Sequence, residues 1–198
     1  MKKIILDLCG GTGSWSKPYK DAGYDVRVIT LPKDDVITYK PPKNVYGVLA
    51  APPCTMFSRA RTTAKTPRDF ESATKIVSAC LRIIWEVQYE NPYSLKFWAM
   101  ENPAGHLRRF MGSPVLKFQP YEFGDRHSKE TWLWGMFNEP KKFPIVLTKK
   151  EIIQSRNNTR PLPSIPAEYL RDEKMKPVQI RRSITPQGFS KAFFKANP

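Results

Sequence analysis

The stretch Lys3-Ile4-Ile5-Leu6-Asp7-Leu8-Cys9-Gly10-Gly11-Thr12-Gly13 lies near the start of the chain and decides its fold. Its first half is a short apolar run that predicts a buried strand, and its glycine cluster predicts a turn directly after that strand. Gly11 and Gly13 allow a tight turn and a close approach of the backbone to a ligand, because neither carries a side chain. Glycine turns after strands are also common for structural reasons alone, so a cofactor loop and a plain turn both remain open.

Three more apolar runs predict strands, and a long segment between two of them predicts a helix. The strands are expected at residues 24–29, 45–51 and 97–101, and the second one stops at two prolines. From Phe70 onward apolar residues recur at helical spacing, with Asp69 as the expected N-cap. This alternation predicts an α/β fold with a mostly parallel sheet and helices on both faces. In such sheets ligands bind beyond the carboxyl ends of the strands.

The length and the cysteine content set broad limits on the protein. A chain of 198 residues fits one domain with a sizeable core. No apolar run approaches the ~20 residues needed to cross a bilayer, and the two-lysine start is unlike a signal sequence, so we expect a soluble, cytoplasmic protein with no membrane partner. The three cysteines lack close-paired spacing, which predicts neither a disulfide framework nor a metal site.

The charge of the chain predicts a polyanionic partner. The net charge is +15, and phosphate neutralisation with counterion release drives nucleic-acid binding. Residues 141–198 hold 13 Lys and Arg against 4 Asp and Glu, a balance of +9, so this part is the expected phosphate-facing surface. The alternative is a solvated basic surface without a nucleic-acid partner.

Cys54 follows a predicted strand and two prolines that fix the backbone, where a reacting ring can reach its thiol. A buried, inert cysteine is the more common interpretation of a lone thiol, and Cys9 and Cys80 fit that interpretation. Cys54 differs because Arg59 and Arg61 follow closely, and we expect these cations to favour the thiolate, which is the nucleophilic form.

Glu101 ends a predicted strand that has no other charged residue. A partly desolvated carboxyl group there would have a raised pKa, as a general acid near neutral pH requires, whereas the alternative role is a structural helix cap. Asp35 is either a hydrogen-bond acceptor for an adenine amine or ribose hydroxyl or a solvated turn residue. His106 and His127 fit ordinary polar roles better than catalytic ones.

Three motifs together resemble the cytosine-C5 DNA methyltransferase family, although none is specific alone. Residues 7–16, with Ala22-Gly23 following, match that family's opening S-adenosylmethionine loop. Pro53-Cys54-Thr55-Met56-Phe57-Ser58 matches its Pro-Cys-x-x-Phe-Ser motif, and Glu101-Asn102-Pro103 matches its Glu-Asn motif. Their order and spacing agree over residues 1 to about 135. The chain looks most like compact phage or prophage-borne members, which act in the cytoplasm of a bacterium or a virus-infected host cell.

The resemblance implies a Rossmann-like S-adenosylmethionine-dependent methyltransferase fold and a defined chemistry. It implies that the Cys54 thiolate attacks cytosine C6 while Glu101 hydrogen-bonds or protonates N3, and that a base in duplex DNA is flipped out to reach both groups. The expected cofactor-binding residues are Asp7, Cys9, Gly10, Gly11, Thr12, Gly13, Ser14, Trp15, Asp35, Val36, Pro53, Arg182 and Ser183. The expected substrate-binding residues are Ser58, Arg59, Arg61, Asn102 and Arg126.

The sequence departs from the family pattern at several positions. Cys9 replaces an aromatic residue, and the acidic residue that the family places after the second strand to hold the ribose is replaced near Thr30. Lys129 stands where a family arginine would contact the cytosine O2, and we expect it to act with the catalytic pair, although a lysine lacks the planar fork of arginine. Arg182-Ser183-Ile184 replaces Asn-Ser-Val, and a cation there leaves a carboxy-S-adenosylmethionine cofactor open besides a surface-facing role.

The chain is short for this family. We expect a catalytic core over residues 1–140, a basic proline-rich segment over 141–178 in place of a target-recognition domain, and a C-terminal segment over 179–198 that packs on the core. The 141–178 segment can contact phosphates but offers few base-reading elements, which predicts weak or very short sequence specificity.

Three functions compete: a DNA cytosine-C5 methyltransferase, a related pyrimidine-C5 enzyme acting on RNA or nucleotides, and a catalytically silent nucleic-acid-binding relic. The presence of both Cys54 and Glu101 argues against the relic. The charge of +15 argues against a free nucleotide, which needs no extended basic face. An adenine-N6 methyltransferase is disfavoured because Pro52-Pro53-Cys54 offers a thiol instead of that class's amine acceptor and aromatic stack. DNA is preferred over RNA on the family resemblance.

Overall fold

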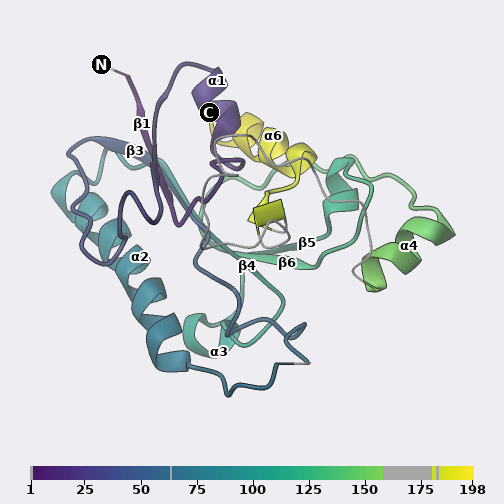
Figure 1. Ribbon diagram of the computed structural model, residues 1–198. Helices are drawn as coiled ribbons and strands as arrows, with labels where there is room; N and C mark the ends of the chain where they lie inside the picture. The colour runs from purple at the N-terminus through teal and green to yellow at the C-terminus, as the bar shows by residue number, and fades with distance from the viewer. Residues whose placement is uncertain (1, 63, 158–179, 182) are drawn as a thin grey trace.

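A six-stranded mixed sheet forms the centre of the protein (Figure 1). The computed structural model describes residues 2–62, 64–157, 180–181 and 183–198. The strand order is β2-β1-β3-β4-β6-β5, in which β1, β2, β3 and β4 are parallel neighbours and β6 pairs antiparallel with both β4 and β5. The strands are β1 (Ile4–Leu8), β2 (Asp25–Ile29), β3 (Val45–Ala50), β4 (Phe97–Pro103), β5 (Leu116–Phe118) and β6 (Thr131–Met136).

Helices cover both faces of this sheet. In Figure 1, α2 lies on one side of the strands, and α1 and α6 lie on the other. The helices are α1 (Lys17–Asp21), α2 (Phe70–Glu90), α3 (Arg108–Met111), α4 (Lys149–Arg156) and α6 (Gln187–Ala196), with a 3-10 turn, η1 (Pro120–Phe123). The predicted α/β fold, with a mostly parallel sheet and helices on both faces, is confirmed, since only β6 runs against the other strands.

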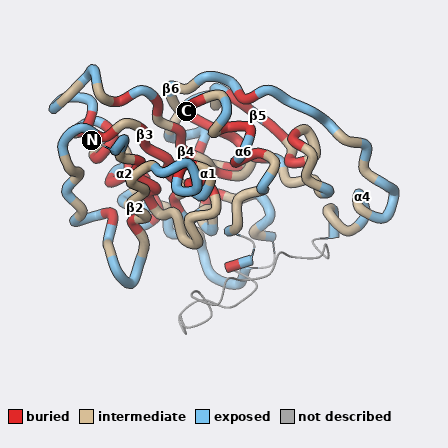
Figure 2. The backbone as a smooth tube through the Cα atoms, turned by 90° about the horizontal axis from the view of Figure 1, so that it is seen from above, coloured by how far each residue is buried: buried red, intermediate tan, exposed pale blue. Residues whose placement is uncertain are grey.

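The side-chain alternation of the strands creates two separate cores. Successive residues of a strand point to opposite faces, so Leu6 packs with α2 while Ile5 packs with α1 and α6. The same alternation separates Val48 from Leu49 on β3. Figure 2 shows the buried segments gathered along the strands and the exposed segments around them. The sheet is therefore buried on both faces, as expected for parallel neighbours.

The helix predicted from Phe70 begins there and ends at Glu90. The Asp69 carboxylate accepts a hydrogen bond of 2.9 Å from the backbone N–H of Ser72, so the predicted N-cap is confirmed. Among the described residues, no helix is long and apolar enough to span a bilayer.

The C-terminal helix α6 packs on the core through an aromatic cluster. Phe189 and Phe193 are fully buried, and Phe193 contacts Trp15 and Phe97 with ring centroids 5.5 and 5.9 Å apart. The Asp125 carboxylate accepts hydrogen bonds from the backbone N–H groups of Gly188 and Phe189 at the start of this helix. The end of the chain is thereby fixed against the strand that carries Phe97.

We predict that Phe193→Ala lowers the free energy of unfolding by about 3–5 kcal/mol, because it removes a fully buried ring and leaves a cavity. Tyr89→Ala is the control, since that ring is 90% exposed on α2 and should change stability by less than about 0.5 kcal/mol. Urea unfolding followed by circular dichroism measures both values. Equal unfolding midpoints for the two variants would contradict the packing of α6 described above.

Candidate active site

Three parallel neighbours, β1, β3 and β4, end at the same edge of the sheet. Their register pairs Leu8 with Ala50 and Ala50 with Met100. Each strand is followed or completed at this edge by a chemically distinctive segment: the glycine loop 9–13 after β1, the Pro52-Pro53-Cys54 turn after β3, and Glu101 near the end of β4. The parallel pairing therefore brings together three segments that are far apart in the sequence.

The Cys54 turn is held by hydrogen bonds from both sides. The Cys54 carbonyl accepts bonds of 3.0 and 2.8 Å from the N–H groups of Phe57 and Ser58. Beneath the turn, the amide Nδ2 of the fully buried Asn102 donates to the carbonyl of Pro52 over 2.9 Å. Asn102 was expected to bind substrate, but the structure places it under the turn, where it fixes the approach to Cys54.

Arg68 organises the same loop, a role that no sequence pattern indicates. Its guanidinium group donates to the carbonyl of Met56 over 2.5 Å and to that of Ser58 over 3.0 Å. These acceptors are backbone atoms ten or more residues away, so no side-chain motif marks the interaction. Arg68 is a positioning residue for the segment that carries Cys54.

Gly105 is the point where β4 and the Cys54 loop touch. Ser58 and Gly105 form an isolated antiparallel bridge, and the N–H of His106 donates to the carbonyl of Phe57 over 2.8 Å. A Cβ on residue 105 would lie 2.1 Å from the Phe57 oxygen, so only glycine permits this approach. The bridge locks the loop to the strand that carries Glu101.

Cys54, Glu101 and Lys129 interact electrostatically. Burial raises the pKa of Cys54, the Glu101 carboxylate raises it further, and the Lys129 ammonium lowers it. Burial likewise raises the pKa of Glu101, and Lys129 lowers it. All three predicted catalytic residues thus lie in one site, where desolvation favours the neutral thiol and the neutral carboxyl, and the lysine favours both anions.

The prediction that Arg59 and Arg61 favour the Cys54 thiolate needs correction, because Lys129 is the cation that lowers this pKa. The Arg61 guanidinium is engaged elsewhere, since Nη2 donates to the Thr66 carbonyl and hydroxyl, each over 2.8 Å. The Arg59 guanidinium lies over the ring of Trp132, 5.7 Å from its centroid.

The glycine loop after β1 surrounds a buried carboxyl group. Gly11 and Gly13 have φ angles of +53° and +65°, and the N–H of Gly13 donates to the Gly10 carbonyl over 2.9 Å. A Cβ on Gly10 would lie 2.4 Å from Cγ of Asp7, so the loop passes directly against that carboxyl. Of this carboxyl, Oδ2 accepts a bond of 2.5 Å from the Ser16 hydroxyl.

Asp7 is 1% exposed, and burial raises its pKa to about 6, although hydrogen bonding from Ser16 opposes the shift. Among the described residues, Oδ1 of Asp7 has no hydrogen-bond partner, and neither has the buried indole Nε1 of Trp15. A buried carboxylate oxygen and a buried N–H without partners mark a site where a polar ligand can supply the missing bonds.

The C-terminal segment closes over the glycine loop. A Cβ on Gly11 would lie 3.8 Å from the Ser183 hydroxyl, and the N–H of Thr185 donates to the Ser14 hydroxyl over 2.8 Å. Ser183 is thus placed beside the loop as expected. The Ser14 hydroxyl, by contrast, already accepts a hydrogen bond from the backbone of the C-terminal segment at Thr185. Arg182, also expected at the cofactor, lies outside the described residues.

Four residues expected at the cofactor also have contacts within the protein: Trp15, Val36, Asp35 and Cys9. Trp15 is a core residue, 2% exposed and packed on Phe189, and Val36 is buried in the other core. The exposed Asp35 carboxylate accepts a bond of 2.9 Å from the N–H of Ile37, as in a capped turn. Cys9, with φ of +55°, is half-buried and joins the loop to β2 through its N–H. Thr12 and Pro53 lie in the glycine loop and the Cys54 turn as expected.

Arg126 was expected to contact substrate, and in the structure its side chain is engaged by a neighbouring helix. Its guanidinium forms a bidentate ion pair with Glu151 of α4, with Nε–Oε1 and Nη2–Oε2 distances of 2.5 and 3.2 Å. Hydrogen bonding from Arg126 and from Thr148 lowers the pKa of Glu151 to about 2. Arg126 therefore holds α4.

The described residues contain no cluster of His, Cys, Asp and Glu that could bind a metal ion.

No protein-family model and no curated protein sequence matches this chain. Solved structures do resemble it, among them a triple variant of DNMT2 from Spodoptera frugiperda with 17% identity and a TM-score of 0.43, covering 74% of this chain and 55% of that chain. The Dnmt2 methyltransferase of S. pombe has 15% identity, a TM-score of 0.44 and coverages of 75% and 57%. The Entamoeba histolytica methyltransferase EhMeth has 11% identity and a TM-score of 0.40, and the match covers 75% of this chain and 58% of that chain. The chain spans just over half the length of these proteins, so its function must be argued from its own site.

We predict that Asp7→Asn removes a pH dependence of stability. The folded protein holds a proton on Asp7 up to pH about 6, whereas the ordinary pKa of this group is 3.8. The unfolding free energy therefore falls as pH rises between these values, and relative to the wild type the variant should gain up to about 3 kcal/mol between pH 4 and 7. Urea unfolding at stepped pH measures this difference.

Ser16→Ala is the companion variant for this titration. The Ser16 hydroxyl lowers the pKa of Asp7, so its removal should extend the pH range of the loss upward. Stability curves of wild type and Asp7→Asn that stay parallel from pH 4 to 7 would show that Asp7 is not buried as described.

Proposed function

We propose that this protein is an S-adenosylmethionine-dependent methyltransferase that modifies C5 of cytosine in DNA. The observation that carries this proposal is the convergence of Cys54, Glu101 and Lys129 at one sheet edge, beside the glycine loop that surrounds Asp7. A thiol and a carboxyl group with raised pKa values are the pair needed to activate a pyrimidine ring, because cytosine C5 is a poor nucleophile until a nucleophile adds at C6.

The residues around the glycine loop fit S-adenosylmethionine. The unpartnered Oδ1 of Asp7 can accept a bond from the ammonium group of the amino-acid moiety, and the backbone at Gly11 and Gly13 leaves room for close approach. Ser183 adds a hydroxyl from the opposite side of the loop. When bound, S-adenosylmethionine supplies the electrophilic methyl group that the activated C5 accepts. The alternative carboxy-S-adenosylmethionine depends on Arg182, which lies outside the described residues.

The chain's own groups account for the proton and bond changes at the base. Cys54 gives up its proton to water, and its sulfur forms a bond to C6 while Glu101 donates a hydrogen bond or a proton at N3. After methylation the C5 proton leaves to water, the electron pair of its bond re-forms the C5–C6 double bond as the C6–sulfur bond breaks, and N3 returns its proton to Glu101. The positive charge of Lys129 favours the thiolate in the first step.

Two features support DNA as the proposed substrate: the positive charge of the chain, and the order of the three sequence motifs that resemble DNA cytosine-C5 methyltransferases. The net charge of +15 favours an extended polyanion over a free nucleotide. RNA is the second candidate, because its cytosines carry the same C5 and C6 atoms and its backbone the same phosphates.

The first test of this proposal is Cys54→Ala, which should lower methyl transfer by about a thousandfold or more because the nucleophile is lost. DNA that contains 5-fluorocytosine should trap the wild-type enzyme, since no C5 proton can leave and the C6–sulfur bond persists. A denaturing gel with mass spectrometry detects this adduct, which Cys54→Ala must not form. An active enzyme without an adduct would exclude the covalent route.

The second test concerns the acid. Glu101→Gln should lower the rate by about 10²–10⁴-fold while DNA binding persists, because an amide can hydrogen-bond at N3 but cannot donate a proton. Unchanged turnover of Glu101→Gln would place the acid elsewhere.

Lys129→Met is the third test, and its signature lies in the pH profile. Lys129 lowers the pKa of both Cys54 and Glu101, so its removal should shift both limbs of the pH–rate profile to higher pH. Fold and binding should stay near those of the wild type. An unshifted profile would mean that Lys129 does not act on the reacting pair.

A further inference from the structure

A second feature lies next to the active site: a cavity of about 380 Å³ whose lining includes three arginine side chains. Its lining residues are Arg59, Gly105, His106, Arg108 and Arg109. They come from the Cys54 loop, from the turn after β4 and from α3, and the Ser58–Gly105 bridge joins the first two. The cavity is therefore built on the same segments that position Cys54 and Glu101.

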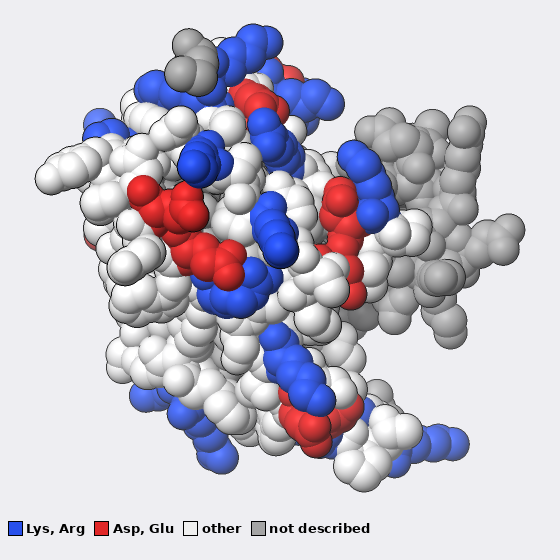
Figure 3. Space-filling model, turned by 90° about the vertical axis from the view of Figure 1, so that its left-hand side faces the viewer, with Lys and Arg blue, Asp and Glu red and all other residues white. Residues whose placement is uncertain are grey.

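The three arginines of this cavity have no acidic partners. Among the described residues, no carboxylate lies within ion-pair distance of Arg59, Arg108 or Arg109. Two other arginines of the described chain do have such partners, in the pairs Arg27–Asp25 and Arg82–Glu86. On the face seen in Figure 3, acidic and basic side chains lie side by side. The positive charge of the cavity is thus left for an external anion to neutralise.

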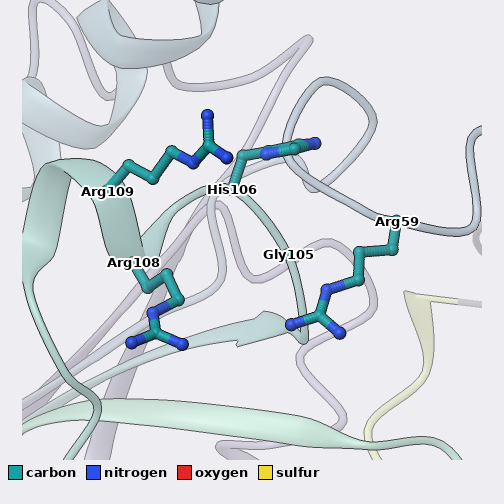
Figure 4. A pocket seen from close by; sticks show the side chains of 5 residues that line it. All are labelled: Arg59, Gly105, His106, Arg108 and Arg109. Carbon is teal, nitrogen blue, oxygen red and sulfur yellow. The ribbon is translucent and has the colours of Figure 1, made fainter.

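Two of the guanidinium groups are held over one indole ring. Arg59 lies 5.7 Å and Arg108 6.0 Å from the ring centroid of Trp132, a distance at which a cation is attracted to an aromatic face. Figure 4 shows the guanidinium groups of Arg59 and Arg108 pointing into the same space. Trp132 is buried and pairs with Asn102 in the sheet register, so this platform is rigidly connected to the active site.

His106 adds a neutral hydrogen-bonding group to the cavity. Desolvation and the charges of Arg68, Arg109 and Arg59 all lower its pKa. A bound anion would offset the charges of these three arginines and so raise the pKa of His106. This pKa therefore reports whether the cavity is occupied.

We propose that this cavity binds a phosphodiester group of the substrate strand, close to the cytosine that reacts with Cys54. Planar guanidinium groups donate pairs of parallel hydrogen bonds and match the oxygens of a phosphate. Two such groups aimed at one space, without internal carboxylates, form a ready-made phosphate clamp. The identification of the strand as cytosine-containing DNA rests on the proposed function, whereas the phosphate chemistry rests on the cavity alone.

Phosphate could also come from a free nucleotide, and the experiment separates the two sources. The double variant Arg108→Gln/Arg109→Gln is titrated with a fluorescent cytosine-containing oligonucleotide, without cofactor, at several salt concentrations. Loss of one phosphate contact should make the slope of log K against log[salt] shallower by about 0.7–0.9. The control Lys40→Gln/Lys43→Gln removes the same charge from exposed positions before β3, at the opposite end of that strand, and should keep the wild-type slope.

Equal slopes for the wild type and both variants would overturn the clamp. Because binding is measured without turnover, this result is distinguishable from failure of the methyltransferase proposal, which the 5-fluorocytosine adduct tests. If the double variant fails to fold, the Arg59→Gln variant carries the same prediction from a different segment.

The wild-type protein offers an independent measurement through His106. The chain contains two histidines, and a His127→Gln variant assigns their NMR signals. The oligonucleotide should raise the pKa of His106 at micromolar concentration, and cytidine 5′-monophosphate should do so only at far higher concentration. An unchanged pKa with saturating oligonucleotide would overturn the clamp, and equal potency of the mononucleotide would overturn its assignment to a strand.

Discussion

The parallel alignment of β1, β3 and β4 is the constraint on which the candidate site depends. Because these neighbours run in one direction, their carboxyl ends lie at one edge, and the glycine loop, the Cys54 turn and Glu101 meet there. The hydrogen bond from Asn102 to Pro52 and the close approach at Gly105 then adjust the Cys54 turn against β4.

The site places ionisable groups where burial opposes their charge. Asp7, Cys54 and Glu101 all have raised pKa values, and desolvation is the largest cause for each. The two carboxyl groups, Asp7 and Glu101, therefore reduce stability near neutral pH, whereas the Cys54 thiol does so only at alkaline pH. The two cores on either face of the sheet offset that cost. Lys129 supplies the only positive charge that acts on the pKa of both Cys54 and Glu101 within the described part of the chain.

Hydrophobic periodicity was sufficient to predict the four parallel strands and the helix from Phe70, because each carries a long or clearly bounded apolar run. It missed β5, which has three residues, and β6, whose apolar stretch at Trp132 gives no clear period. The motif order placed Cys54, Glu101 and Lys129 together. Arg68 was missed because it bonds to backbone carbonyls, and the pairing of Arg126 with Glu151 because it depends on where α4 lies.

The proposed reaction of this site is transfer of a methyl group to C5 of cytosine in DNA. The direct test incubates the purified protein with S-adenosylmethionine that is labelled in its methyl group. Separate reactions contain duplex DNA, single-stranded DNA, RNA or nucleotides as the methyl acceptor. We expect labelled 5-methylcytosine in DNA, identified by mass spectrometry of the hydrolysed bases. Label on adenine, or no label in any pool from a folded protein that binds the cofactor, would contradict it.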